Sequence, residues 1–237
     1  MALALCLFCG CSPENAEKQK PLPRNKPYPA QTKVKDSNQN RSERTKNSVG
    51  VKWKTNCGAR LVQLKPSPKR PAVMIMTRLG VFYIELFAEK ATAHVSAFLE
   101  RVEANDYDGT IFHRVVPGFL IQGGGYDSKL RKRTTETRLP SEARNGVMNL
   151  RGTLAMSRLD NDPHSAHREW FINLSDNLQL DHKGPSPLEY GYTVFGQVIA
   201  GMEVVDRISR EPIQRKGPFP DGVPIEPVVI KRIKRVR

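Results

Sequence analysis

Residues 112–125 read FHRVVPGFLIQGGG, and this stretch determines which fold we expect. It contains two short apolar runs, 111–116 and 119–122, on either side of a Pro-Gly turn. Three glycines end the second run, and they allow a close approach of the backbone and unusual backbone angles. The stretch therefore predicts two strands joined by a tight turn.

The polar residues of this stretch point to a candidate site. In strand geometry Arg114 shares a face with Phe112 and Val116. A guanidinium among apolar side chains costs free energy unless it is hydrogen-bonded or reaches a groove. Gln122 points with Leu120 after the turn. We expect these side chains to form a pocket for an uncharged ligand that carries a carbonyl group.

The rest of the chain from residue 72 onward predicts a mainly β domain. Val95, Phe98, Leu99 and Val102 repeat at helical spacing and predict one amphipathic helix, and a second short helix is expected at 202–208. Many short strands with two helices, and no regular alternation of strand and helix, favour an antiparallel barrel, closed so that no edge strand is exposed. The other expected strands are a hairpin at 72–77 and 81–87, then 153–157, 169–173, 193–199 and 226–233.

The positive charge of the chain is concentrated before residue 72. The formal net charge is +14, and residues 12–71 hold 15 basic and 4 acidic side chains, whereas residues 72–237 hold 23 and 20. Residues 12–71 are also rich in Pro, Asn, Ser and Gln, so we expect a disordered basic linker. It shows no nucleic-acid recognition motif, which argues against a specific nucleic-acid partner, while attraction to an anionic membrane surface remains open.

The first eleven residues, MALALCLFCGC, form an apolar run that is too short to cross a bilayer as a helix but long enough for the core of a signal peptide. The run ends in a pattern that resembles the lipobox of bacterial lipoproteins, in which a small residue precedes a lipidated cysteine. The resemblance implies acylation of Cys11 and anchoring in a bacterial cell envelope, facing the periplasm or the exterior. The alternative is a cytoplasmic protein.

Five segments together resemble the cyclophilin family of peptidyl-prolyl cis-trans isomerases in its bacterial form. They are FHRVVPGFLIQGG, GTLAMSR at 152–158, EWFIN at 169–173, LD at 180–181 and YTVFGQVIAGMEVVD at 192–206. The resemblance covers residues 72–235 and implies an isomerase domain at 72–237, with an eight-stranded antiparallel barrel closed by two helices. It further implies a monomer that acts on proline-containing polypeptides without a cofactor or a metal.

The resemblance also implies roles for individual residues. Arg114 would donate a hydrogen bond to the prolyl nitrogen or the adjacent carbonyl as the peptide bond twists. Gln122 would hold the substrate backbone, and His113 and Tyr192 would line the rim. The other residues implied in substrate binding are Phe119, Leu120, Ser157, Arg158, Phe171 and Leu180.

One residue departs from the family pattern. The family usually has Gln-Phe-Phe where this chain has Glu169, Trp170 and Phe171. Glu169 would pair with the guanidinium of Arg114 and either orient or sequester it. The sequence therefore leaves an alternative open, a proline-binding module or chaperone of the same fold with weak or no turnover.

Three other features are interpreted as structural. His164 and His167, near Asp160 and Asp162, are better explained by a solvated turn than by a metal site. Neither Ser157 nor Ser165 lies in a nucleophile elbow. The glycines at 123–125 lack the lysine and the following helix of a phosphate-binding loop.

Overall fold

The computed structural model describes residues 67–134 and 137–236. The expected signal segment at 1–11, the lipidation candidate Cys11 and the linker up to residue 66 lie outside the described residues. The first strand begins at Ala72, the residue at which the sequence predicts the start of the isomerase domain.

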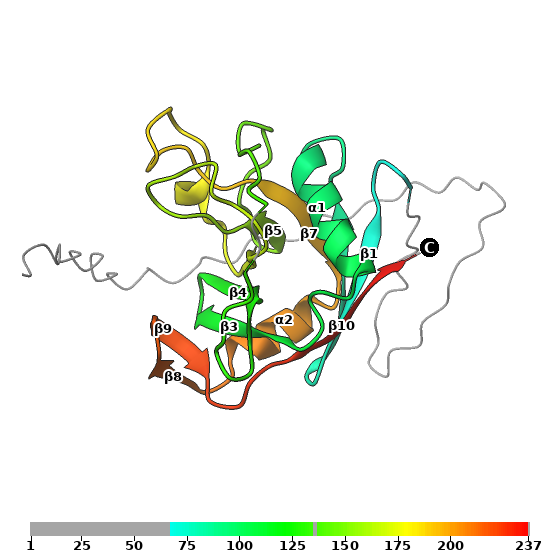
Figure 1. Cartoon of the computed structure of the whole chain (residues 1–237), viewed down its shortest axis with the longest axis vertical. Coiled ribbons are helices and arrows are strands. Elements are labelled where there is room, and N and C mark those ends of the chain that lie inside the picture. The colour runs from blue at the N-terminus through cyan, green and yellow to red at the C-terminus, as the bar shows by residue number, and fades with distance from the viewer. Residues whose placement is uncertain (1–66, 135–136, 237) are drawn as a thin grey trace, which may run out of the picture. The chain divides into compact units, whose positions relative to one another are not determined.

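An eight-stranded antiparallel sheet in the order β10-β1-β2-β7-β5-β6-β4-β3 forms the body of the domain (Figure 1). A separate hairpin, β8 with β9, packs next to β3. The strands are β1 (Ala72–Thr77), β2 (Gly80–Leu86), β3 (Thr110–Val116), β4 (Leu120–Asp127), β5 (Thr153–Met156), β6 (Trp170–Asn173), β7 (Val194–Ala200), β8 (Ile213–Lys216), β9 (Phe219–Pro224) and β10 (Ile230–Val236).

Two α-helices lie within the described residues, α1 (Thr92–Glu103) and α2 (Met202–Ser209), with a short 3-10 helix η1 (Leu178–Leu180). Helix α1 packs next to β10, and α2 packs against β2, β3 and β4 (Figure 1). Both helices and every predicted strand are confirmed, although β4 extends five residues beyond its predicted end at 122 and β10 begins four residues after its predicted start at 226. The β8–β9 hairpin was not predicted, because its prolines and glycines read as loop.

The prediction of a closed barrel was wrong, since β3 and β10 remain the two edges of the sheet. Among the described residues, an isolated bridge between Ile111 and Val229 and backbone hydrogen bonds beside it connect the edges. The bonds run from Gly109 N–H to Ile230 O (2.9 Å) and from Phe112 N–H to Val228 O (3.0 Å). The preceding residue, Pro227, has no N–H to extend this ladder.

The inner face of the sheet holds the main hydrophobic core. Helix α1 contributes Val95, Phe98 and Val102, the face that its sequence predicted. The ring of Phe98 contacts Phe195 at 5.5 Å between centroids and Trp170 at 6.3 Å, in edge-to-face geometry. These contacts fix the position of β6 and β7 relative to α1.

A bulge in β3 corrects the prediction that Phe112 and Arg114 share a face. Phe112 pairs with Gly123 and Arg114 pairs with Gln122, so His113 is an extra residue on β3. Phe112 consequently turns into the core and meets Trp170 edge to face at 5.6 Å. Arg114 stays on the opposite face, and the core no longer has to accommodate its charge.

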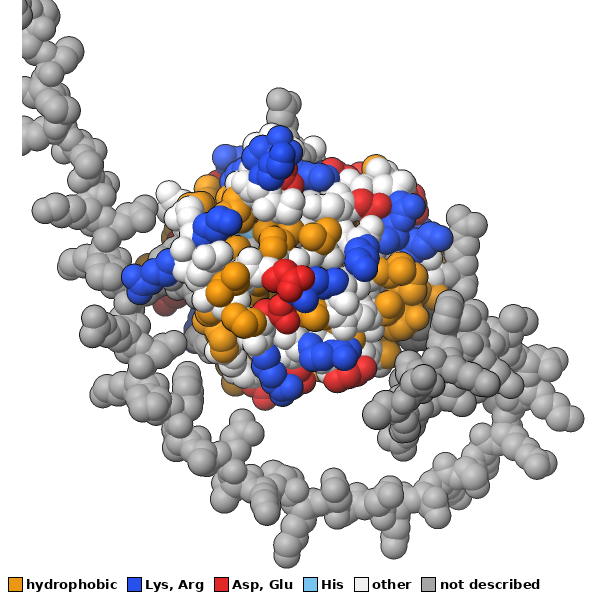
Figure 2. Space-filling model, turned by 90° about the horizontal axis from the view of Figure 1, so that it is seen from below, with side chains coloured by type: hydrophobic (Ala, Val, Ile, Leu, Met, Phe, Trp, Pro, Cys, Tyr) orange, Lys and Arg blue, Asp and Glu red, His pale blue; other side chains and the backbone are white. Residues whose placement is uncertain are grey.

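The outer surface mixes charges of both signs. In the view of Figure 2, basic and acidic side chains are interspersed with apolar ones. Neither described helix is long and apolar enough to cross a membrane.

Candidate active site

The outer face of the sheet carries an apolar cluster in register with Arg114 and Gln122. Cross-strand pairs join Arg114 to Gln122, Gln122 to Phe171, Phe171 to Ala155, and Ala155 to Val194. Direct cross-strand partners lie on the same face of a sheet, so these five residues form one row, which we call the outer row. A cation and a carboxamide therefore stand at one end of a row of apolar side chains.

Further apolar side chains surround the outer row. Leu120 is buried with Ala155, Phe171 and Val194 in a cluster distinct from the main core. The side chains that pack against this cluster are Phe87, Phe119, Val147, Leu180 and Tyr192. Phe119, Leu120, Phe171, Leu180 and Tyr192 were all predicted from the sequence as substrate-binding residues, and the structure brings them together.

Arg114 is half-buried on β3, and its positive charge affects Tyr192, which packs against the apolar cluster of the outer row. Burial raises the pKa of the Tyr192 hydroxyl, and the nearby Asp160 adds to this, while the positive charges of Arg158 and Arg114 oppose the rise. The Tyr192 ring meets Phe171 edge to face at 5.6 Å. Arg114 and Tyr192 thus flank the same apolar surface.

A polar network backs the carboxamide of Gln122. Its Nε2 atom donates to Ser157 Oγ at 3.2 Å and to Glu169 Oε2 at 3.0 Å. The Nε2 atom of His113 lies 3.2 Å from the same Glu169 oxygen. Glu169 is therefore directed to His113 and Gln122, and its pairing with Arg114 stays a prediction.

His113 differs from its expected place at the rim, because its side chain is fully buried. The ring lies 4.6 Å from the ring of Tyr126 and 5.0 Å from that of Phe219, centroid to centroid. Phe219 comes from the β8–β9 hairpin, which covers this part of β3. His113 is placed behind Glu169, where it supports the site from inside.

The charge state of Glu169 follows from these neighbours. Burial raises its pKa, but the close contact and charge of His113, the charge of Lys132 and the hydrogen bond from Gln122 outweigh burial. The pKa of Glu169 is held below its ordinary value of 4.5 as a result. The side chain is a carboxylate at neutral pH, and a carboxylate only accepts hydrogen bonds.

Arg158 organises the rim of the outer row. Its guanidinium donates to Gly191 O and Leu159 O, both at 2.8 Å. It also donates to Asp160 O at 3.2 Å and to Pro187 O at 2.8 Å. The guanidinium carbon lies 4.7 Å from the centre of the Tyr192 ring. These contacts hold two loops and Tyr192 in place, while the predicted contact of Arg158 with substrate stays a prediction.

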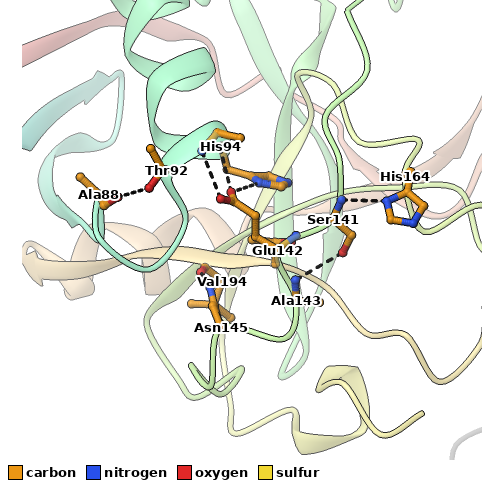
Figure 3. A network of polar contacts seen from close by, with 11 residues as sticks. Ala88, Thr92, His94, Ser141, Glu142, Ala143, Asn145, His164 and Val194 are labelled. Carbon is orange, nitrogen blue, oxygen red and sulfur yellow. Dashed lines mark hydrogen bonds and ion pairs between the residues drawn. The ribbon is translucent and has the colours of Figure 1, made fainter. Parts of the chain in front are cut away.

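A second polar network fixes the loop that supplies Val147 (Figure 3). The carboxylate of Glu142 accepts the backbone N–H groups of Ala93 (3.2 Å) and His94 (3.1 Å) at the start of α1. It also lies 2.6 Å from His94 Nδ1. Asn145 Nδ2 donates to the carbonyl of Val194 at 2.9 Å. The loop is thereby tied both to α1 and to the end of the outer row.

Sequence reasoning missed several residues of the site. Ala155 and Val194 alternate with core residues in predicted strands, so their period-2 pattern was the available signal. Tyr126 lies on β4 beyond the end of the predicted strand at 119–122. Phe219 lies on the β8–β9 hairpin, which was not predicted. Within residues 67–134 and 137–236, no group of three or more His, Cys, Asp and Glu side chains is arranged to hold a metal ion.

Comparisons with known proteins agree with this geometry. Residues 72–235 match the family model described as cyclophilin type peptidyl-prolyl cis-trans isomerase/CLD. Peptidyl-prolyl cis-trans isomerase A of Dickeya dadantii is 41% identical over 165 residues, covering 70% of this chain and 84% of the relative. Peptidyl-prolyl cis-trans isomerase B of Escherichia coli is 42% identical over 161 residues, covering 68% of this chain and 97% of the relative.

A solved structure has the same fold. The crystal structure of a Cryptosporidium parvum cyclophilin type peptidyl-prolyl cis-trans isomerase, determined in the presence of the dipeptide ala-pro, superposes with a TM-score of 0.57 at 26% identity. The match covers 70% of this chain and 99% of that one. The fold is that of a prolyl isomerase, and the chain belongs to the cyclophilin-type family. It is a peptidyl-prolyl cis-trans isomerase similar to the bacterial enzymes.

Proposed function

We propose that the outer row is the active site for isomerisation of X-Pro bonds, with Arg114 as the catalytic residue. The observation that carries this proposal is the cross-strand register that joins Arg114 and Gln122 to Phe171. It combines a cation, a carboxamide and an apolar surface within one row. A prolyl segment offers the matching groups, an apolar ring beside a backbone amide.

The chemistry needs no bond to be broken. Rotation about a peptide bond meets a barrier of about 18–20 kcal/mol because the C–N bond has partial double-bond character. As the bond twists, the nitrogen becomes pyramidal and more basic. Arg114 donates a hydrogen bond to the developing lone pair or to the adjacent carbonyl, and it does so most strongly in the twisted state, which is what accelerates a reaction.

The apolar side chains and the carboxamide have separate tasks in this proposal. Phe171 and Leu120 hold the proline ring still, while the preceding carbonyl swings. Phe119 and Leu180 extend the apolar surface at its edges, and Gln122 holds the substrate backbone. The outer row thus binds one side of the amide and leaves the other free to rotate.

The experiment that tests the function is exchange spectroscopy on an Ala-Pro peptide in the presence of the purified chain. We expect cis-trans exchange faster than uncatalysed isomerisation, which takes tens to hundreds of seconds. A protein that binds the peptide and leaves exchange at that rate would be the binding module that the sequence left as the alternative.

We further propose that the enzyme acts outside the cytoplasm, anchored by acylation of Cys11. The support is the lipobox-like pattern at 8–11 together with the basic composition of residues 12–71, which favours an anionic membrane surface. Radiolabelled palmitate should be incorporated in a bacterial host and lost in Cys11→Ser. Equal labelling of the two proteins, or none, would contradict acylation at this residue.

A further inference from the structure

The carboxamide of Gln122 can turn either its oxygen or its nitrogen toward a ligand, and the two orientations demand opposite partners. The inner half of the group faces Ser157 Oγ at 3.2 Å and Glu169 Oε2 at 3.0 Å. No described residue donates a hydrogen bond to the outer oxygen, Gln122 Oε1, and the side chain is half-buried. The outer atom is therefore available to a ligand.

Glu169 determines which atom lies inside. A carboxylate has no proton to donate, so only the Nε2 group of Gln122 forms a favourable contact with it. The opposite orientation would bring two acceptor oxygens within 3.0 Å of each other. Ser157 imposes no such choice, because a hydroxyl both donates and accepts. The glutamine that the family usually has in place of Glu169 would also accept either orientation.

Glu169 is itself held in place. Its side chain is 13% exposed, and His113 Nε2 lies 3.2 Å from the carboxylate. A Cβ atom on Gly125 would lie 2.4 Å from Glu169 Cγ, so only glycine leaves room for this side chain. The other titratable groups that interact with the carboxylate are Tyr126, Lys132 and His167.

We propose that Glu169 is a positioning residue, which locks the Gln122 carboxamide with its nitrogen inward and its oxygen toward the substrate. The enzyme then selects polypeptides that offer a backbone N–H to this oxygen next to the proline. The inference rests on the proposed active site, and it adds a direction to the hydrogen bond between Gln122 and substrate. The lock is a property of this chain, because it requires a carboxylate at residue 169.

The test uses ester-for-amide peptides, in which one backbone N–H at a time near the proline of an Ala-Ala-Pro-Phe peptide is replaced by oxygen. Affinities of the full chain and of Glu169→Gln are measured by titration. We expect one of these replacements to weaken binding to the natural chain by about 2- to 10-fold, the worth of one neutral hydrogen bond. In Glu169→Gln the same replacement should cost less than about 2-fold, since the carboxamide can turn.

A second readout follows the carboxamide directly. The side-chain NH2 signals of Gln122, assigned by their loss in Gln122→Ala, should differ between the natural chain and Glu169→Gln. The matched control is Glu103→Gln on the surface of α1. This variant should show the same loss of affinity for the ester peptide as the natural chain, which we call the ester penalty, and the same NH2 signals of Gln122. Far-UV circular dichroism checks the fold of each variant.

Equal ester penalties in the natural chain and Glu169→Gln, or unchanged Gln122 signals, would contradict the proposal that Glu169 fixes the orientation of the Gln122 carboxamide. This result is separate from the proposed function, because binding is measured here and turnover is not. If exchange catalysis were absent while the ester penalty behaved as expected, the proposed function would fail and the lock would stand.

Discussion

Replacement of Arg114 by alanine removes the cation from the outer row and leaves the apolar side chains in place. The residue is half-buried on an edge strand and lies outside the main core, so we expect the fold to survive. A hydrogen bond from a charged donor contributes about 1.5–3 kcal/mol, and each 1.36 kcal/mol changes a rate tenfold. Arg114→Ala should therefore lower kcat/KM by about 10- to 100-fold.

Arg114→Lys separates charge from geometry. A lysine keeps the positive charge but lacks the planar fork of the guanidinium, so we expect activity between those of the natural chain and Arg114→Ala. The matched control is Arg235→Ala, which removes an exposed arginine that pairs with Glu103 between β10 and α1. It should leave kcat/KM unchanged.

The assay is exchange spectroscopy or a protease-coupled measurement on an Ala-Pro peptide, with far-UV circular dichroism and a thermal melt on each variant. The expected pattern is a large loss of kcat/KM with an unchanged spectrum in Arg114→Ala alone. Full activity in Arg114→Ala would remove this residue from the mechanism. A loss of similar size in Arg235→Ala would show that the effect is not local to the outer row.

Three further predictions follow from contacts around the site. Gly125→Ala places a Cβ atom 2.4 Å from Glu169 Cγ, so the Glu169 side chain has to shift. We expect a lower melting temperature and, as in Glu169→Gln, a smaller loss of affinity when the peptide N–H is replaced by an ester oxygen. A melting temperature and a loss of affinity that both match the natural chain would contradict this. Arg158→Ala removes four hydrogen bonds to backbone carbonyls, so at about 0.5 kcal/mol each the free energy of unfolding should fall by about 2 kcal/mol or more in urea, with faster proteolysis at residues 183–190. Burial lowers the pKa of His94 below 6.5, against the opposing effect of Glu142, so the unfolded chain binds the proton more tightly and stability should fall as pH drops below 6.5. Urea titrations at pH 7.5 and 5.5 should show this loss in the natural chain and a smaller one in His94→Gln, whereas equal losses would rule out His94 as the cause.

The sequence was sufficient for the order of the helices and of the main-sheet strands and for most of the apolar side chains around the outer row, but not for the open sheet or the β8–β9 hairpin. Alternating apolar residues mark one face of a strand, and repeats at helical spacing mark one face of a helix, so the hairpin at 72–87 and the buried face of α1 could be assigned without coordinates. The chemical types at Phe119, Leu120, Gln122 and Phe171 also pointed to an apolar site with a polar end. These are local properties, which depend on residues close together along the chain.

The tertiary structure decided what depends on pairing between distant segments. The bulge at His113 turned Phe112 into the core, and no local pattern signals such a bulge. Glu169 reached His113 and Gln122 because β6 pairs with β4 and β4 with β3, in a register that only the assembled sheet defines. Side-chain periodicity tells which face a residue takes, whereas the partner across the face is set by strand order and register.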